Sequence, residues 1–265
     1  MPSNNPLQQY FRQPAIYIKL PSNGDFYPDG AIDMPPNREI PVYPMTAIDE
    51  ITYRTPDALF NGSATTNVIK SCVPNILDPW SIPATDLDSI LTGIRAATNG
   101  SEIELESACP NCKEITGYSI NLIQLLSTID PSGYEKLLKV GELSFKFKPL
   151  SYKEINQSNM FQFELQREID SVNTIEDISQ RTNKSNSIMK KLTEMNIALV
   201  ADTIESITTP NTTVDDRKFI QEYLRGCDKN TYEEIRQHVI NIREAVNIKP
   251  LTMQCSGCEI GRAHV

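Results

Sequence analysis

The chain has 265 residues, 39% of them hydrophobic, and a formal net charge of −9 at pH 7, which indicates one large or two small soluble globular domains. No apolar run approaches the roughly 20 residues of a membrane span, and the first residues do not combine a basic segment with an apolar one, so we expect neither a membrane contact nor a signal peptide. The acidic balance also argues against a general affinity for nucleic acid, which needs clustered Lys and Arg.

The first 45 residues are rich in proline and predict an extended β arm. Residues 15–20 alternate as a strand does, and residues 38–43 predict a second strand that Pro41 confines to a sheet edge. Two interpretations stay open, pairing with a neighbour's sheet or packing on its own domain. We favour residues 10–43 as a partner-facing surface, and we expect deletion of residues 1–45 to leave a folded core.

Residues 46–100 predict a helical segment. Thr46 and Asp49 have the spacing of a capping box, with Asp in place of the usual Glu. We interpret Asp86 and Asp88 as acids of a first helical turn, favoured by the helix dipole, rather than as a metal-binding pair. The three helices are expected at about residues 46–60, 63–73 and 86–98.

Two Cys-x-x-Cys pairs stand far apart in the chain, Cys109 with Cys112 and Cys255 with Cys258. Two intervening residues let one tight turn direct both sulfurs at one ion, and four thiolates suit tetrahedral zinc. A redox pair or unrelated buried thiols are the alternatives, but neither pair opens a helix after a βαβ strand, as a thioredoxin-like motif does. Four protein sulfurs leave no open coordination position, so we expect one structural zinc ion and not a catalytic one.

A shared ion would join two distant segments, residues 101–148 and residues 249–259, around a mostly helical insertion at residues 149–248. The first segment is expected to hold a zinc hairpin and further β strands. Cys72 and Cys227 have no partner at this spacing and are interpreted as packing residues. The predicted fold class is therefore α+β, with small β elements that include a zinc-ribbon-like four-cysteine clamp, a helical insertion and the N-terminal arm.

Three features of the insertion lead to specific expectations. The polar run at residues 181–186 predicts a break or an exposed bend between helices. Residues 204–214 predict a loop or short hairpin, and Thr231 with Glu234 predicts a capping box at the start of the last helix.

Catalytic signatures are missing from the sequence. It contains neither a glycine-rich phosphate loop nor a G-x-S-x-G nucleophile elbow. His238 lies alone on a polar helix and is interpreted as a surface residue. We therefore expect no enzyme activity, no small-molecule substrate and no bound cofactor other than zinc.

The last residues raise a separate hypothesis. Residues 259–265 can be encoded by a string that contains a widely used short-read sequencing adapter. We hypothesise that residues 260–265 are adapter sequence translated in frame, and that the natural chain continues past Cys258 with a strand. These residues are left out of the fold expectations.

Several sequence blocks occur in one order: NPLQQYFRQP at 5–14, IYIKLPS at 16–22, FYP at 26–28, PVYPMT at 41–46, TPDALFNG at 55–62 and CVPN at 72–75. Together they resemble baseplate proteins of T4-like contractile-tailed phages, a family that includes the T4 baseplate hub subunit and a hub-assembly protein. Many members carry a Cys-x-x-Cys pair where Cys109 and Cys112 stand.

The resemblance implies a structural component of the baseplate hub, made in the host cytoplasm and retained in the virion, with other baseplate and hub proteins as partners. One alternative is a hub-assembly factor that leaves before the particle is complete. Another is a zinc-ribbon module that binds nucleic acid, which would need a basic face near the cysteines. Only Lys113 stands there, and the preceding strand is acidic.

Overall fold

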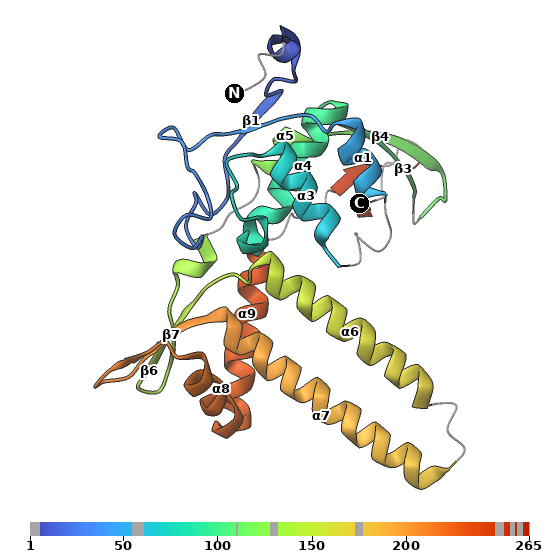
Figure 1. Cartoon of the computed structure of the whole chain (residues 1–265). Coiled ribbons are helices and arrows are strands. Elements are labelled where there is room, and N and C mark those ends of the chain that lie inside the picture. Colours follow the sequence, from blue (N-terminus) through green and yellow to red (C-terminus); the bar gives the residue numbers. More distant parts are fainter. Residues whose placement is uncertain are drawn as a thin grey trace.

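The computed structural model describes residues 6–54, 61–109, 111–127, 132–172, 177–246, 252–254, 258 and 262–264. It confirms a mixed α+β fold with small antiparallel sheets. Figure 1 shows an upper lobe, a lower lobe, and two long helices that run side by side away from the lobes. Within the described residues, no helix combines the length and apolar character needed to cross a membrane.

The elements follow the two lobes in chain order. The upper lobe contains η1 (Pro6–Tyr10), β1 (Ile16–Ile18), β2 (Ile40–Val42), α1 (Ala47–Tyr53), α3 (Ser63–Cys72), η2 (Pro79–Ser81), α4 (Ala84–Asn99), β3 (Glu102–Ala108), β4 (Ile115–Asn121) and α5 (Leu122–Leu126). The lower lobe contains η3 (Ser132–Glu135), β5 (Leu138–Val140), β6 (Leu143–Phe147), α6 (Tyr152–Val172), α7 (Ile178–Thr203), β7 (Ile204–Thr208), β8 (Thr213–Val214), α8 (Arg217–Gly226) and α9 (Lys229–Val246). The chain then returns to the upper lobe with β9 (Thr252–Gln254) and β10 (Arg262–His264).

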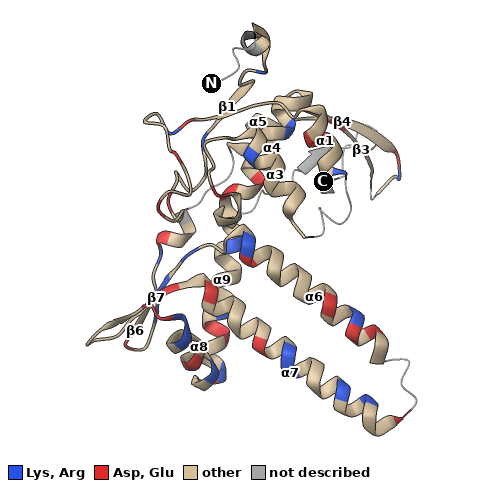
Figure 2. Ribbon diagram, viewed as in Figure 1, with Lys and Arg blue, Asp and Glu red and all other residues tan. Residues whose placement is uncertain are grey.

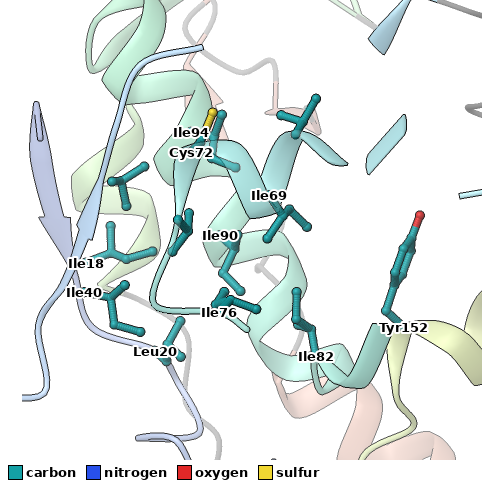
Figure 3. Packing of buried hydrophobic residues seen from close by; sticks show 13 residues of the cluster. Ile18, Leu20, Ile40, Ile69, Cys72, Ile76, Ile82, Ile90, Ile94 and Tyr152 are labelled. Atoms are coloured by element: carbon teal, nitrogen blue, oxygen red, sulfur yellow. The ribbon is translucent and has the colours of Figure 1, made fainter. Parts of the chain in front are cut away.

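The N-terminal arm forms part of the upper core. Strands β1 and β2 pair antiparallel, and their inward side chains pack against α3 and α4 (Figure 3). The arm therefore packs on its own chain, which was one of the two interpretations left open. Deletion of residues 1–45 would remove Ile18, Leu20, Ile40 and Val42 from this core, so we now expect it to destabilise the fold rather than leave a folded core.

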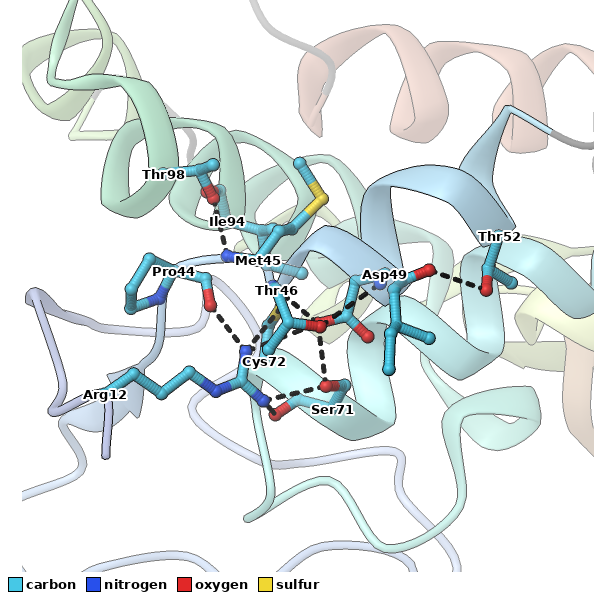
Figure 4. A network of polar contacts seen from close by, with 11 residues as sticks. Arg12, Pro44, Met45, Thr46, Asp49, Thr52, Ser71, Cys72, Ile94 and Thr98 are labelled. Atoms are coloured by element: carbon cyan, nitrogen blue, oxygen red, sulfur yellow. Dashed lines mark hydrogen bonds and ion pairs between the residues drawn. The ribbon is translucent and has the colours of Figure 1, made fainter. Parts of the chain in front are cut away.

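A polar network also holds the arm (Figure 4). The Arg12 guanidinium donates to the Ser71 carbonyl at 2.7 Å and to the Ser71 hydroxyl at 2.8 Å, and a further bond goes to the Pro44 carbonyl. It also lies 3.4 Å from an Asp49 carboxylate oxygen. One side chain thus joins the arm to α1 and α3.

The lower lobe is built on a four-stranded antiparallel sheet in the order β5-β6-β7-β8. Phe145 and Phe147 of β6 are fully buried against apolar residues of α8 and α9, such as Ile220 and Ile235. This agrees with the further β strands expected within residues 101–148. The hairpin of β7 and β8 confirms the one expected at residues 204–214.

The two lobes are joined directly at the start of α6. The Ala84 backbone nitrogen donates to the Leu150 carbonyl and the Tyr152 nitrogen donates to the Ile82 carbonyl, both at 2.7 Å. Tyr152 also stacks on Trp80, with ring centroids 5.5 Å apart. Helix α6 therefore starts inside the upper core and extends away from it.

The polar run at residues 181–186 lies inside the continuous helix α7, so the predicted break is wrong. Apolar side chains such as Leu165 on α6 and Ile188 on α7 form one small core between the helices. The polar run faces mostly outward, where it interferes with neither the helix nor that core.

Helix starts were predicted with mixed success. Thr46 and Asp49 do form a capping box at α1, which confirms that prediction. The capping box predicted at Thr231 is wrong, because α9 begins earlier, at Lys229. Asp228 instead accepts hydrogen bonds from the backbone nitrogens of Asn230 and Thr231, at 2.9 and 3.1 Å.

His238 is half-buried on α9, so its interpretation as a surface residue is wrong. Its ring lies with its centroid 4.9 Å from that of Phe147. Burial lowers its pKa below the ordinary value, although a hydrogen bond with the Lys136 backbone acts in the opposite direction.

Candidate metal centre

The first cysteine pair lies in the turn of the β3–β4 hairpin. The strands pair in register from Glu102 opposite Asn121 to Ala108 opposite Ile115. The Cys109 nitrogen then donates to the Glu114 carbonyl at 2.8 Å, and the Lys113 nitrogen donates to the Cys109 carbonyl at 2.9 Å. Two backbone bonds therefore fix the turn from which both thiols project.

Lys113 adopts a left-handed backbone conformation, with φ of 64°. Such a residue is uncommon outside tight turns and is stable only where its surroundings demand it. Here it follows Cys112 directly and brings the chain back toward β4. Sequence reasoning did not foresee this, because lysine is not a residue that signals positive φ.

Cys258 joins this turn from the other end of the chain. Its Sγ lies 3.8 Å from Sγ of Cys109, across 149 positions of sequence. The ligand atoms of Cys109, Cys112 and Cys258 all lie within 4.8 Å of one another. Cys255, the fourth predicted ligand, lies outside the described residues.

The spacing of the sulfurs fits a tetrahedral metal site. Zn–S bonds of about 2.3 Å at tetrahedral angles place two sulfurs about 3.8 Å apart, which is the Cys109–Cys258 distance. A disulfide would instead require about 2.05 Å between these two sulfurs. Thiolates are soft ligands that suit zinc. The residues present can therefore hold such an ion.

A neighbouring side chain supports the sulfurs. The Asn111 amide donates to the Cys258 Sγ at 3.6 Å, a distance typical of hydrogen bonds to sulfur. Such contacts orient metal ligands and stabilise the charge on a thiolate. The sequence carried a weak signal for this role, because Asn is a frequent turn residue and stands between the two cysteines.

Acidic residues flank this centre. Glu102, Glu104 and Glu106 alternate along the exposed side of β3. Figure 2 shows both signs of charge interspersed along α6 and α7, but no basic face beside the β3–β4 hairpin among the residues it colours. This distribution weighs against the nucleic-acid alternative, because phosphate contacts need clustered cations.

Cys72 and Cys227 lie away from this cluster. Cys72 is wholly buried in the upper core, and burial raises its pKa to about 11. Cys227 is half-buried after α8, and burial raises its pKa too. Their environments agree with the interpretation of both as packing residues.

Three thiols from two distant parts of a mixed α+β chain thus lie close together. The family model described as T4 bacteriophage base plate protein matches residues 44–264, and the chain belongs to this family. No curated protein and no solved structure matches the chain significantly.

Membership of this family defines the broad role of the chain. It is a structural baseplate protein, and the family implies contacts with other phage baseplate proteins. The matched part begins at residue 44, so β1 and β2 lie before it although their side chains complete its core.

Proposed function

We propose that the chain is a structural component of the baseplate hub of a T4-like contractile tail, held in shape by one zinc ion. The proposed ligands are Cys109, Cys112, Cys255 and Cys258. The observation that carries the proposal is the convergence of three of these sulfurs in a member of the baseplate family. The role needs no catalysis and is exerted through contacts with other proteins.

The proposed ion acts as a clasp between the two ends of the insertion. The chain leaves the upper lobe near β4, builds the lower lobe, and returns beside β3 and α1 (Figure 1). Zinc ligation contributes roughly 10–16 kcal/mol of apparent folding free energy in zinc-finger peptides. That is similar to the whole stability of a typical domain. A clasp of this strength would hold the lobes at a fixed angle while neighbouring subunits assemble around them.

Native mass spectrometry of the purified chain tests the ion. We expect one zinc in the wild-type chain and in Cys227→Ser, which serves as a matched control because it removes a thiol elsewhere. Cys109→Ser, Cys255→Ser and Cys258→Ser should each lose the ion or bind it more weakly. Wild-type chain that stays metal-free in the presence of zinc would contradict this part of the proposal.

Quantitative mass spectrometry of purified phage particles tests the hub role. A structural component should be present in a fixed number of copies in every baseplate, and crosslinking should place it beside proteins of the hub. If particles lack the chain although infected cells need it to form baseplates, it is an assembly factor and the proposed virion role is wrong.

A further inference from the structure

The first described residues carry large apolar side chains that face solvent. In the N-terminal tip, defined here as residues 6–11, Leu7 is 61% exposed, Tyr10 is 76% exposed and Phe11 is 55% exposed. Figure 1 shows η1 standing clear of the helices of the upper lobe. Three such residues within one short segment form an apolar surface of the kind that marks interaction sites.

The 3-10 geometry of the tip places two of these side chains on the same side of the segment. Residues i and i+3 of a 3-10 helix eclipse each other, so Leu7 and Tyr10 of η1 lie one above the other. Phe11 follows at the end of the turn and extends the same run of large apolar side chains. Tyr17, on the outward side of β1, is exposed as well.

The tip is held at its base. Arg12, the next residue, is bound to Ser71 and Pro44 and lies beside Asp49 (Figure 4). The apolar side chains are therefore presented from a fixed point of the upper lobe. Fixing a binding segment before it binds reduces the entropy lost on association.

The charge of the tip indicates the chemistry of its partner. Arg12 is the only charged residue between positions 6 and 18, and its guanidinium serves the internal network. A surface without charge fits an apolar groove without charge. A lipid surface is a poorer fit, because interfacial segments usually add exposed Lys and Arg.

We propose that the N-terminal tip is a docking peptide that inserts Leu7, Tyr10 and Phe11 into an uncharged apolar groove of another baseplate protein. This inference rests on the proposed baseplate role. Because the family match begins at residue 44, the contact lies outside the matched part of the chain. It supplies a specific attachment in addition to the contacts of that part.

Complementation of a phage with a disabled copy of the gene tests the tip. The full-length chain is supplied from a plasmid as wild type, as the double variant Tyr10→Ser/Phe11→Ser, or as the control Ile178→Ser/Met189→Ser. The control removes two apolar side chains of similar exposure, 72% and 65%, from α7. The readouts are the yield of complete baseplates and the copies of the chain in each.

We expect the tip variant to lower incorporation at least about tenfold, as loss of a central aromatic contact does, and the control to behave as wild type. Both variants should unfold at the wild-type temperature, because the altered side chains are exposed. Washing baseplates at low and high salt should release the wild-type chain equally, because the contact contains no charge.

Normal yield and normal incorporation of the tip variant would overturn the inference. So would a wild-type dimer in solution that the tip variant fails to form, or tip-dependent sedimentation with phosphatidylcholine–phosphatidylglycerol vesicles. If wild-type chain supports baseplate formation but is absent from particles, the virion role fails instead, and the yield obtained with the tip variant then decides whether the tip docks.

Discussion

Asp86, in the first turn of α4, accepts hydrogen bonds from the backbone nitrogen of Ser22 at 2.8 Å and from the Ser22 hydroxyl. The two residues stand 64 positions apart, and both are buried. The pair joins the turn after β1 to the start of α4. The position of Asp86 in a first helical turn was predicted from the sequence, but the main contact of its side chain is with the N-terminal arm.

The pH dependence of stability should reveal this buried acid. Burial raises the pKa of Asp86, against the opposing effect of hydrogen bonds from Ser22 and Thr85. Because its folded-state pKa is raised, Asp86 contributes stability that is fully present below its unfolded-state pKa of about 3.9. That contribution is lost as the pH rises through the folded-state pKa.

The side chain of Asp86→Asn keeps an oxygen that can accept hydrogen bonds from Ser22, but this side chain cannot ionise. As the pH rises from the unfolded-state pKa of Asp86 to its folded-state pKa, the variant should gain stability relative to wild type by about 1.4 kcal/mol per unit of pKa difference. Urea unfolding of both proteins over a pH series measures the change. A difference in unfolding free energy that is constant with pH would contradict the assignment.

Asp49 should show the opposite pH dependence. Its burial acts to raise the pKa, but hydrogen bonds from Thr46 and Ser71 and the charge of Arg12 lower it below the ordinary value. Its contribution to stability is therefore present above a pH of about 3.9 and is lost as the pH falls through the folded-state pKa. Wild type should lose stability in acid more steeply than Asp49→Asn does.

Arg12→Gln should destabilise the fold at neutral pH by about 1–3 kcal/mol, because it leaves partly buried acceptors without their charged donor. Arg12→Lys should not restore the loss, because an ammonium lacks the planar fork that reaches both Pro44 and Ser71. Chemical unfolding measures the stability of both variants.

Lys19→Gln is the control, because Lys19 and Glu39 form an exposed pair at 3.7 Å, and this substitution should change stability little. Equal losses from Arg12→Gln and Lys19→Gln would refute the network.

Gly62 is required by its surroundings. It has φ of 77°, and an added Cβ would lie 2.8 Å from Asn156 Oδ1 and 3.0 Å from the Tyr152 hydroxyl oxygen. The adjacent Asn61 carbonyl accepts a bond from the Asn156 amide at 3.0 Å, which joins α6 to the start of α3. A side chain at position 62 would disturb this contact between the lobes.

Gly30 is a matched control, because it has φ of 76° and open space where its Cβ would lie. Gly30→Ala should cost about 1–2 kcal/mol through the left-handed backbone alone. Gly62→Ala should cost about 1–3 kcal/mol more through overpacking. Thermal or urea unfolding compares the two, and equal losses would show that Asn156 and Tyr152 move aside freely.

Local sequence patterns predicted the elements whose stability is local. The two strands of the arm, the hairpin of β3 and β4, and the helix α4 were all expected from the sequence. The start of α3 at Ser63 agrees with the helix expected at residues 63–73, but its N-cap is Gly62, which makes no side-chain cap. That glycine is fixed by contacts with α6, which no local pattern encodes.

Long-range partners explain the remaining differences. Arg12 binds Ser71 and Asp86 binds Ser22, and each pair is separated by about 60 positions, so no local pattern indicates either contact. The cysteine cluster is the exception. Paired spacing alone predicted that Cys109, Cys112 and Cys258 would meet, because two such pairs are typical of the ligands of one zinc ion.

Removal of the proposed zinc ion should therefore act where the cysteines meet. With a strong chelator, the wild-type chain is expected to lose several kcal/mol of stability, given the roughly 10–16 kcal/mol that ligation supplies in small zinc-binding peptides. Hydrogen exchange should increase in β3, β4 and β9, while the buried core of the lower-lobe sheet changes little. Cys258→Ser should unfold like the chelated wild type and respond little to chelator, and Cys227→Ser should behave as wild type throughout. If complete removal of bound zinc leaves exchange in the β3–β4 hairpin unchanged, the backbone bonds at Cys109 alone hold the turn, and the ion is not the clasp.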